Sequence, residues 1–131
     1  MKKTLLLAAA LACSGAVAQE KQVWACQQIE GTMLNWENNS WENYGVAPYN
    51  ILFTLDTSTT GSVKKSNEDS ADSLTCNYFS GLVSCHDLSL GTHYYFNRAS
   101  GKLGFSALFG AIWNTPNRDS VGVSIFNCTK F

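Results

Sequence analysis

Two histidines and five cysteines are the side chains of this 131-residue chain best suited to metal binding, proton transfer or redox chemistry. His86 and His93 flank the segment Leu88-Ser89-Leu90-Gly91. If that segment is a four-residue turn, the two imidazoles lie side by side on neighbouring strands, where they could hold a metal ion or transfer protons. Because the spacing fixes no third ligand, we interpret His86 and His93 as ordinary strand residues and only weak metal-ligand candidates.

Four of the cysteines follow the apparent signal segment described below, and none of them forms a C-x-x-C pair. An even number of cysteines in an exported chain predicts two structural disulfides. A hairpin turn at Ser80-Gly81 would set Cys76 opposite Cys85 in a narrow, non-hydrogen-bonded pair, whose Cα separation of about 4.5 Å suits a disulfide. Cys26 and Cys128 then remain for a second bridge, which would tie the first predicted strand to the last.

Other catalytic sets are missing from the sequence. There is no G-x-S-x-G nucleophile elbow. Glycoside hydrolysis needs two carboxylates at a defined separation, and spacing does not bring together any two of the candidates, which are Glu30, Glu37, Glu42, Asp56, Asp87 and Asp119. We therefore expect a protein that is not an enzyme and has no cofactor, with a hydrolase of unknown type as the least favoured alternative.

Residues 1–18 have the three parts of a secretory signal peptide: a basic start, a short apolar run and a small-residue cleavage site that ends at Ala18. Cleavage there predicts a periplasmic or secreted protein with one domain, residues 19–131. The alternative is a lipoprotein whose lipid is attached to Cys13. No later stretch reaches the roughly 20 apolar residues that a membrane-spanning helix needs.

Removal of the signal segment leaves 7 basic and 10 acidic residues, a formal net charge of −3. No basic patch is evident, so we expect no binding to nucleic acid. The acidic balance favours a protein partner that is itself basic. Charged residues are sparse while aromatic, Asn, Ser and Thr residues are plentiful, a composition that favours strands joined by polar turns.

Short alternating apolar runs separated by turn residues predict an all-β domain. We expect a small antiparallel meander barrel of about eight to nine strands, stapled by two disulfides, with a two-layer β-sandwich as the alternative. Asn38-Asn39 predicts a two-residue hairpin turn that sets Trp36 opposite Trp41. The predicted strands are 23–29, 32–36, 41–46, 51–55, 74–79, 82–88, 92–97, 103–109 and 121–128, with a weaker one at 61–65.

The aromatic residues outnumber what a core of this size needs, so some must lie on the surface, where aromatic side chains often mark binding sites. In the run Tyr94-Tyr95-Phe96, at least one ring must face away from the core of a strand. Loop 110–118 and the polar segment 64–72 are the predicted contact loops. The predicted binding residues are Trp113, Asn114, Asn117, Arg118, Tyr94 and Tyr95.

These features predict a small exported binding protein, either an inhibitor or an immunity protein directed against a cell-wall enzyme or toxin. A calycin-like carrier is the alternative, with an apolar ligand inside a barrel lined by Trp24, Phe53 and Phe105. Such a carrier needs an internal cavity of about 300 Å³ or more. The sequence carries no motif of a specific family.

Overall fold

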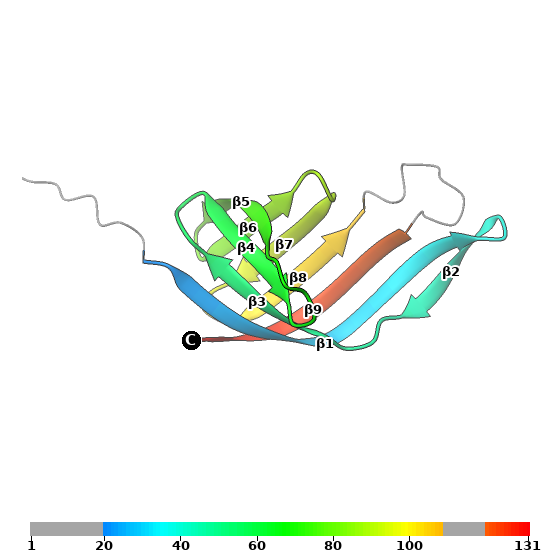
Figure 1. Ribbon diagram of the computed structural model, residues 1–131, viewed down its shortest axis with the longest axis horizontal. Coiled ribbons are helices and arrows are strands. Elements are labelled where there is room, and N and C mark those ends of the chain that lie inside the picture. The colour runs from blue at the N-terminus through cyan, green and yellow to red at the C-terminus, as the bar shows by residue number, and fades with distance from the viewer. Residues whose placement is uncertain (1–19, 109–119) are drawn as a thin grey trace, which may run out of the picture.

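The computed structural model describes residues 20–108 and 120–131, which form one antiparallel sheet of nine strands (Figure 1). Neighbouring strands follow the order β2-β1-β3-β4-β5-β6-β7-β8-β9, and β1 also pairs with β9. This last pairing closes β1 and β3–β9 into an eight-stranded barrel, with β2 outside it, so the predicted meander barrel is confirmed. The strands are β1 (Gln22–Glu37), β2 (Ser40–Gly45), β3 (Asn50–Leu55), β4 (Thr60–Lys65), β5 (Asp72–Phe79), β6 (Leu82–Asp87), β7 (Thr92–Asn97), β8 (Lys102–Ala107) and β9 (Ser120–Lys130).

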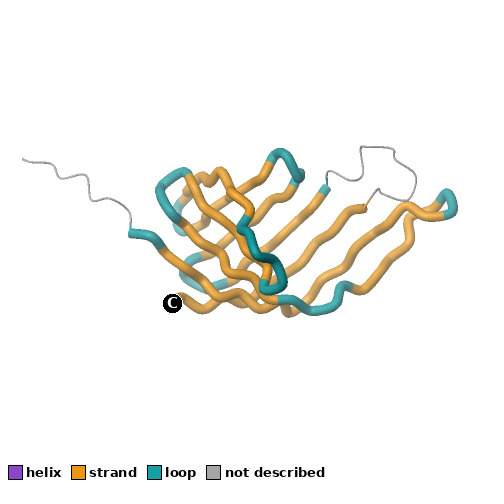
Figure 2. Tube along the Cα trace, in the orientation of Figure 1, coloured by secondary structure: helices purple, strands orange, loops and turns teal. Residues whose placement is uncertain are grey.

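Strands joined by short turns make up the described part of the chain (Figure 2). Within residues 20–108 and 120–131 there is no helix that is long and apolar enough to cross a membrane. The predicted signal segment, residues 1–18, lies outside the described residues.

The first strand differs from the sequence prediction. The sequence predicts separate strands at 23–29 and 32–36, whereas the structure has the single strand β1. The register of β1 against β9 shifts between Gln28 and Glu30, which marks a β-bulge. A bulge bends and twists a strand without ending it, so pairing with β9 continues past it as far as Asn35 opposite Ser120.

The bulge divides β1 into two halves with different partners. Residues 22–27 pair with β3, and residues 32–37 pair with β2. The hairpin 31–45, which we call the flap, therefore projects beyond the barrel (Figure 1). Asn38 and Asn39 form its turn with φ angles of 51° and 63°, as predicted. The rings of Trp36 and Trp41 meet edge to face with centroids 5.4 Å apart.

Aromatic rings fill the centre of the barrel. Phe53 and Phe96 are fully buried, and their centroids lie 5.4 Å apart. Trp24 packs against Phe96 at 4.8 Å and Tyr94 against Phe53 at 6.0 Å. The Nε1 atom of Trp24 is the one buried side-chain polar atom of the described residues that has no hydrogen-bond partner. Other fully buried side chains are Leu55, Val83, Leu103 and Phe126.

Both predicted disulfides are present. Cys26–Cys128 joins β1 to β9, and Cys76–Cys85 joins β5 to β6. In each bridge the two residues lie directly opposite one another with their Cα atoms 4.0 Å apart, which is the short spacing of a non-hydrogen-bonded pair. Disulfides of this kind are compatible with an oxidising compartment.

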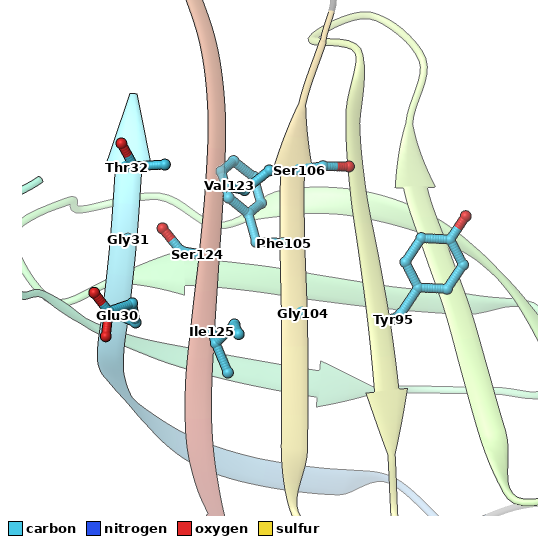
Figure 3. Close-up of a pocket in the computed structure, with 10 residues that line it drawn as sticks. All are labelled: Glu30, Gly31, Thr32, Tyr95, Gly104, Phe105, Ser106, Val123, Ser124 and Ile125. Atoms are coloured by element: carbon cyan, nitrogen blue, oxygen red, sulfur yellow. The ribbon is translucent and has the colours of Figure 1, made fainter. Parts of the chain in front are cut away.

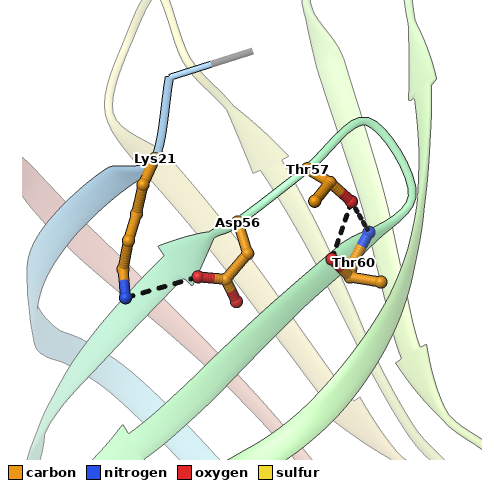
Figure 4. A network of polar contacts seen from close by, with 4 residues as sticks. All are labelled: Lys21, Asp56, Thr57 and Thr60. Carbon is orange, nitrogen blue, oxygen red and sulfur yellow. Dashed lines mark hydrogen bonds and ion pairs between the residues drawn. The ribbon is translucent and has the colours of Figure 1, made fainter. Parts of the chain in front are cut away.

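Threonine side chains hold the turn between β3 and β4 (Figure 4). The backbone nitrogen of Thr60 donates to Thr57 Oγ1 at 3.1 Å, and the two hydroxyls lie 2.7 Å apart. Beside this turn, Lys21 Nζ lies 3.4 Å from Asp56 Oδ1. Because exposed ion pairs contribute little to stability, the hydrogen bonds within the turn are the stronger local constraint.

We expect the two disulfides to differ in their contribution to stability. In the loop-entropy description, a bridge stabilises by about 4–5 kcal/mol when it closes ~100 residues and by about 2–3 kcal/mol when it closes about ten. The separations here are 102 and 9 residues. The double variant Cys26→Ala/Cys128→Ala should therefore unfold at lower urea concentration than Cys76→Ala/Cys85→Ala, as followed by tryptophan fluorescence. An equal or reversed loss would contradict the loop-entropy explanation.

Substitutions at Gly101 and Gly81 test how closely β9 packs against the turn before β8. Both have positive φ, 66° and 90°, so alanine is strained at either position. A Cβ atom on Gly101 would also clash with the carbonyl oxygen of Cys128, whereas nothing lies within 4 Å of one on Gly81. Gly101→Ala should lower the free energy of unfolding by at least about 1 kcal/mol more than Gly81→Ala. Equal losses in urea titrations would mean that β9 can move away at this point.

Candidate functional site

The outer face of the sheet carries a band of apolar side chains that we call the outer patch. Residues that lie directly opposite in an antiparallel ladder share a face. Five members are among the exposed large hydrophobic residues, with exposed fractions of 37% for Leu34, 43% for Trp41, 47% for Val123, 49% for Ile125 and 57% for Tyr95. Scattered exposed apolar residues are ordinary, but a contiguous band marks an interaction surface. Its members are Leu34, Trp36, Trp41, Tyr95, Val121, Val123 and Ile125.

Strand register brings the outer patch together from distant parts of the chain. Leu34 on the flap lies opposite Val121 on β9. Gly104 on β8 lies between Ile125 on β9 and Tyr95 on β7. The patch therefore runs from the flap across β9 and β8 to β7.

A groove of about 420 Å³ opens in the outer patch at Gly104 (Figure 3). The backbone of Gly104 does not have positive φ, and an added Cβ atom would have no neighbour nearer than 4.0 Å. Neither conformation nor crowding therefore requires glycine at this position. Its effect is to leave out a side chain between Tyr95 and Ile125, and the missing side chain creates the hollow.

The groove residues come from the adjacent strands β1, β9, β8 and β7 (Figure 3). Residues 30–32 lie on β1, residues 123–125 on β9, residues 104–106 on β8, and Tyr95 on β7. Besides the hydroxyl of Tyr95, the polar groups among them are the side chains of Glu30, Thr32, Ser106 and Ser124. Glu30 supplies the one charged group, at the β1 side of the groove.

Gln28 fixes the bend of β1 beside the groove. Its buried amide donates from Nε2 to Ser124 Oγ at 3.2 Å and accepts at Oε1 from the backbone nitrogen of Tyr49 at 3.2 Å. Burial raises the pKa of the Tyr49 phenol. A Cβ atom on Gly31 would collide with the side chains of Gln28 and Ser124. This packing sets the direction in which the flap leaves the barrel.

The flap carries acidic side chains and no basic ones. Within residues 31–45 the charged residues are Glu37 and Glu42. The Tyr44 hydroxyl donates to Glu37 Oε2 at 2.8 Å, and this hydrogen bond raises the pKa of Tyr44. Because side chains alternate along a strand, both carboxylates lie on the face of the flap opposite to Trp36 and Trp41. The flap is therefore apolar on one face and acidic on the other.

The predicted binding residues fall into three groups. Tyr95 belongs to the outer patch and is 57% exposed. Tyr94 is 6% exposed, and its ring lies 5.1 Å from that of Phe105 inside the barrel. Burial raises the pKa of Tyr94. Neighbours along a strand face opposite sides, so Tyr94, which was predicted as a contact residue, points into the barrel while Tyr95 points outward. The other four lie outside the described residues: Trp113, Asn114, Asn117 and Arg118.

The predicted contact loop at 64–72 is shorter in the structure. Lys64 and Lys65 belong to β4, and Asp72 begins β5. Lys65 Nζ pairs with Glu68 Oε1 at 2.9 Å within the turn. A second, more polar hollow of about 620 Å³ lies beside this turn, on the outer face of β9, β1, β3 and β4.

His86 and His93 lie directly opposite one another on β6 and β7, as the predicted turn requires. Their ring centroids are 5.7 Å apart. The neighbouring Asp87 accepts hydrogen bonds from the hydroxyl and the backbone nitrogen of Ser89, which lower the pKa of that carboxyl. The described residues contain no group of three or more His, Cys, Asp or Glu side chains placed to hold a metal ion.

Comparison of the chain with protein-family models, with curated proteins and with solved structures finds no match. The function is therefore inferred from the geometry of the outer patch and its groove.

Sequence reasoning identified Tyr95 but missed the rest of the outer patch, because its members come from strands far apart in the chain. One signal was present in the sequence. In β9, the outward-facing residues Val121, Val123 and Ile125 alternate with inward-facing residues, which include the buried Phe126. Apolar residues on both faces of a strand indicate that each face meets a partner.

We expect Gly104→Val to keep or raise stability, although it places a large side chain in the groove. Valine favours strands, and glycine loses more backbone entropy on folding, so the gain should be about 0.5–1 kcal/mol. Gly61→Val is the matched control, because a Cβ atom there would lie 2.6 Å from the carbonyl oxygen of Thr54. In urea titrations only Gly61→Val should be destabilised. A loss of stability in Gly104→Val would contradict the presence of free space above Gly104.

Proposed function

We propose that this chain is an exported binding protein that inhibits, or gives immunity against, a cell-wall-directed enzyme or toxin. The outer patch is the surface that contacts this target. The observation that carries the proposal is the apolar groove at Gly104, flanked by exposed Tyr95 and Ile125 within a band of apolar side chains.

The make-up of this surface supports protein binding. Interfaces are enriched in aromatic residues at their centre and depleted of charge there. Here Tyr95, Trp41 and Trp36 lie on one face together with branched aliphatic residues of β9. The groove suits an apolar side chain of the partner, because tight interfaces bury a few anchoring side chains in pockets of this kind.

Charge supports a basic partner. Glu30 borders the groove, whereas Glu37 and Glu42 lie on the flap face opposite to the outer patch, and residues 31–45 include no lysine or arginine. An acidic surface accelerates the encounter with a basic protein through long-range attraction. Enzymes that act on negatively charged cell-wall polymers are a class in which such basic surfaces are useful.

The carrier alternative has less support. The side chains that would line its cavity, Trp24, Phe53 and Phe105, belong to the packed core or lie against it. Ring contacts of 4.8–6.0 Å link Trp24, Phe96, Phe53 and Tyr94 across the interior. A ligand inside the barrel would have to displace these rings.

The test uses purified basic cell-wall hydrolases, with a c-type lysozyme as the first probe. The exported protein should slow lysis of a peptidoglycan suspension and should bind the enzyme in surface plasmon resonance. Ile125→Glu and Gly104→Val should each raise Kd at least tenfold, which corresponds to about 1.4 kcal/mol.

The matched control is Leu52→Glu. Leu52 is 42% exposed on the outer face of β3, away from the outer patch, so its Kd should change less than twofold. If no member of a panel of basic hydrolases binds, the proposed target class is wrong. If Leu52→Glu weakens binding as much as Ile125→Glu does, the proposed surface is wrong.

A further inference from the structure

Both histidines of the chain occupy one place in the fold. The sequence contains two histidines, and they lie directly opposite one another on β6 and β7. They face outward, because Cys85 and Tyr94, the next residues along each strand, point into the barrel. Both imidazoles are partly exposed. All the imidazole groups of the protein are therefore gathered at one accessible point.

The hydrogen-bond pattern of the sheet places His86 and His93 in the type of cross-strand pair that has the closer side chains. Cys76 and Cys85 form a narrow pair with a Cα separation of 4.0 Å, so the adjacent pair, Thr75 and His86, is hydrogen-bonded. The backbone N–H and C=O of His86 then point toward β5, so His86 has no backbone group directed at β7. His86 and His93 are therefore a non-hydrogen-bonded pair, whose side chains approach more closely than those of the alternate pairs.

The imidazoles are free to act as ligands. Their centroids lie 5.7 Å apart with an angle of 30° between the ring planes. Within residues 20–108 and 120–131, neither ring takes part in a side-chain hydrogen bond or an ion pair. The two rings contact each other, and His86 interacts electrostatically with the neighbouring Asp87. Two imidazoles on one zinc ion have Zn–N bonds of about 2.0–2.1 Å, which places the two nitrogens about 3–3.5 Å apart. Side-chain rotation at this centroid distance allows that geometry.

We propose that His86 and His93 together bind one divalent transition-metal ion of the zinc, nickel or copper class. Imidazole nitrogen is a preferred ligand of these ions and a poor one for magnesium or calcium. The hydroxyl-bearing residues Thr75 and Ser106 flank the pair in the same cross-strand row. The remaining coordination positions of the ion face solvent on the outer side of the sheet.

The proposal is tested by titrating the purified exported protein with zinc chloride and with nickel chloride in a calorimeter, at pH 7.5. One ion should bind per chain. His86→Gln and His93→Gln should each weaken binding at least tenfold, because each leaves a single imidazole in a chain that has no other histidine. Zinc should also raise the Tm of the wild-type protein and leave that of both variants unchanged.

Ser106→Ala is the control for a substitution at the cross-strand neighbour of His93. The metal affinity of this variant should stay within twofold of the wild type. Ile125→Glu should likewise bind the ion normally, which separates this site from the outer patch and its partner. Binding that survives in both glutamine variants, or no binding by the wild-type protein at millimolar zinc and nickel, would overturn the proposal. Equal affinity of the wild type and one glutamine variant would show attachment to a lone surface imidazole.

Discussion

Closure of the sheet between β1 and β9 is the constraint on which the rest of this structure depends. Pairing begins with Trp24 opposite Lys130 and ends with Asn35 opposite Ser120, and the Cys26–Cys128 disulfide holds its register. A slip by one residue would move every side chain of β9 to the other face. The core residue Phe126 and the outer-patch residue Ile125 would then exchange places, so the barrel interior and the candidate binding surface depend on the same register.

The long strand β1 serves two parts of the molecule because a bulge interrupts its register without ending it. Its first half closes the barrel against β3, and its second half supports β2 in the flap. The buried amide of Gln28 and the close packing at Gly31 hold the bend between the halves. The flap thus has a fixed relation to the barrel, and its apolar face continues the outer face of β9. A binding surface built on a paired sheet is better ordered than one built on loops alone.

Gly101 and Gly104 have different roles, one in the packing of the barrel and the other on its surface. Gly101 is required for structure, because it has positive φ and lies against the backbone of Cys128. Gly104, on the strand that follows, has open space above it and ordinary backbone geometry. Selection for stability alone would favour a β-branched residue at Gly104. The groove at Gly104 thus comes at some cost in strand propensity, and stability and recognition commonly compete in this way.

Residue spacing was sufficient to predict the features that are local to one hairpin. Turn residues fixed the register there, so the Cys76–Cys85 bridge, the Trp36–Trp41 contact and the facing histidines followed from spacing. The tertiary structure alone decided the continuity of β1, which depends on pairing with a strand about 90 residues away along the chain. It also decided that Tyr95 and not Tyr94 faces outward. Alternation along a strand defines two faces but does not show which one will be buried. Which face is inside depends on how the sheet closes into a barrel.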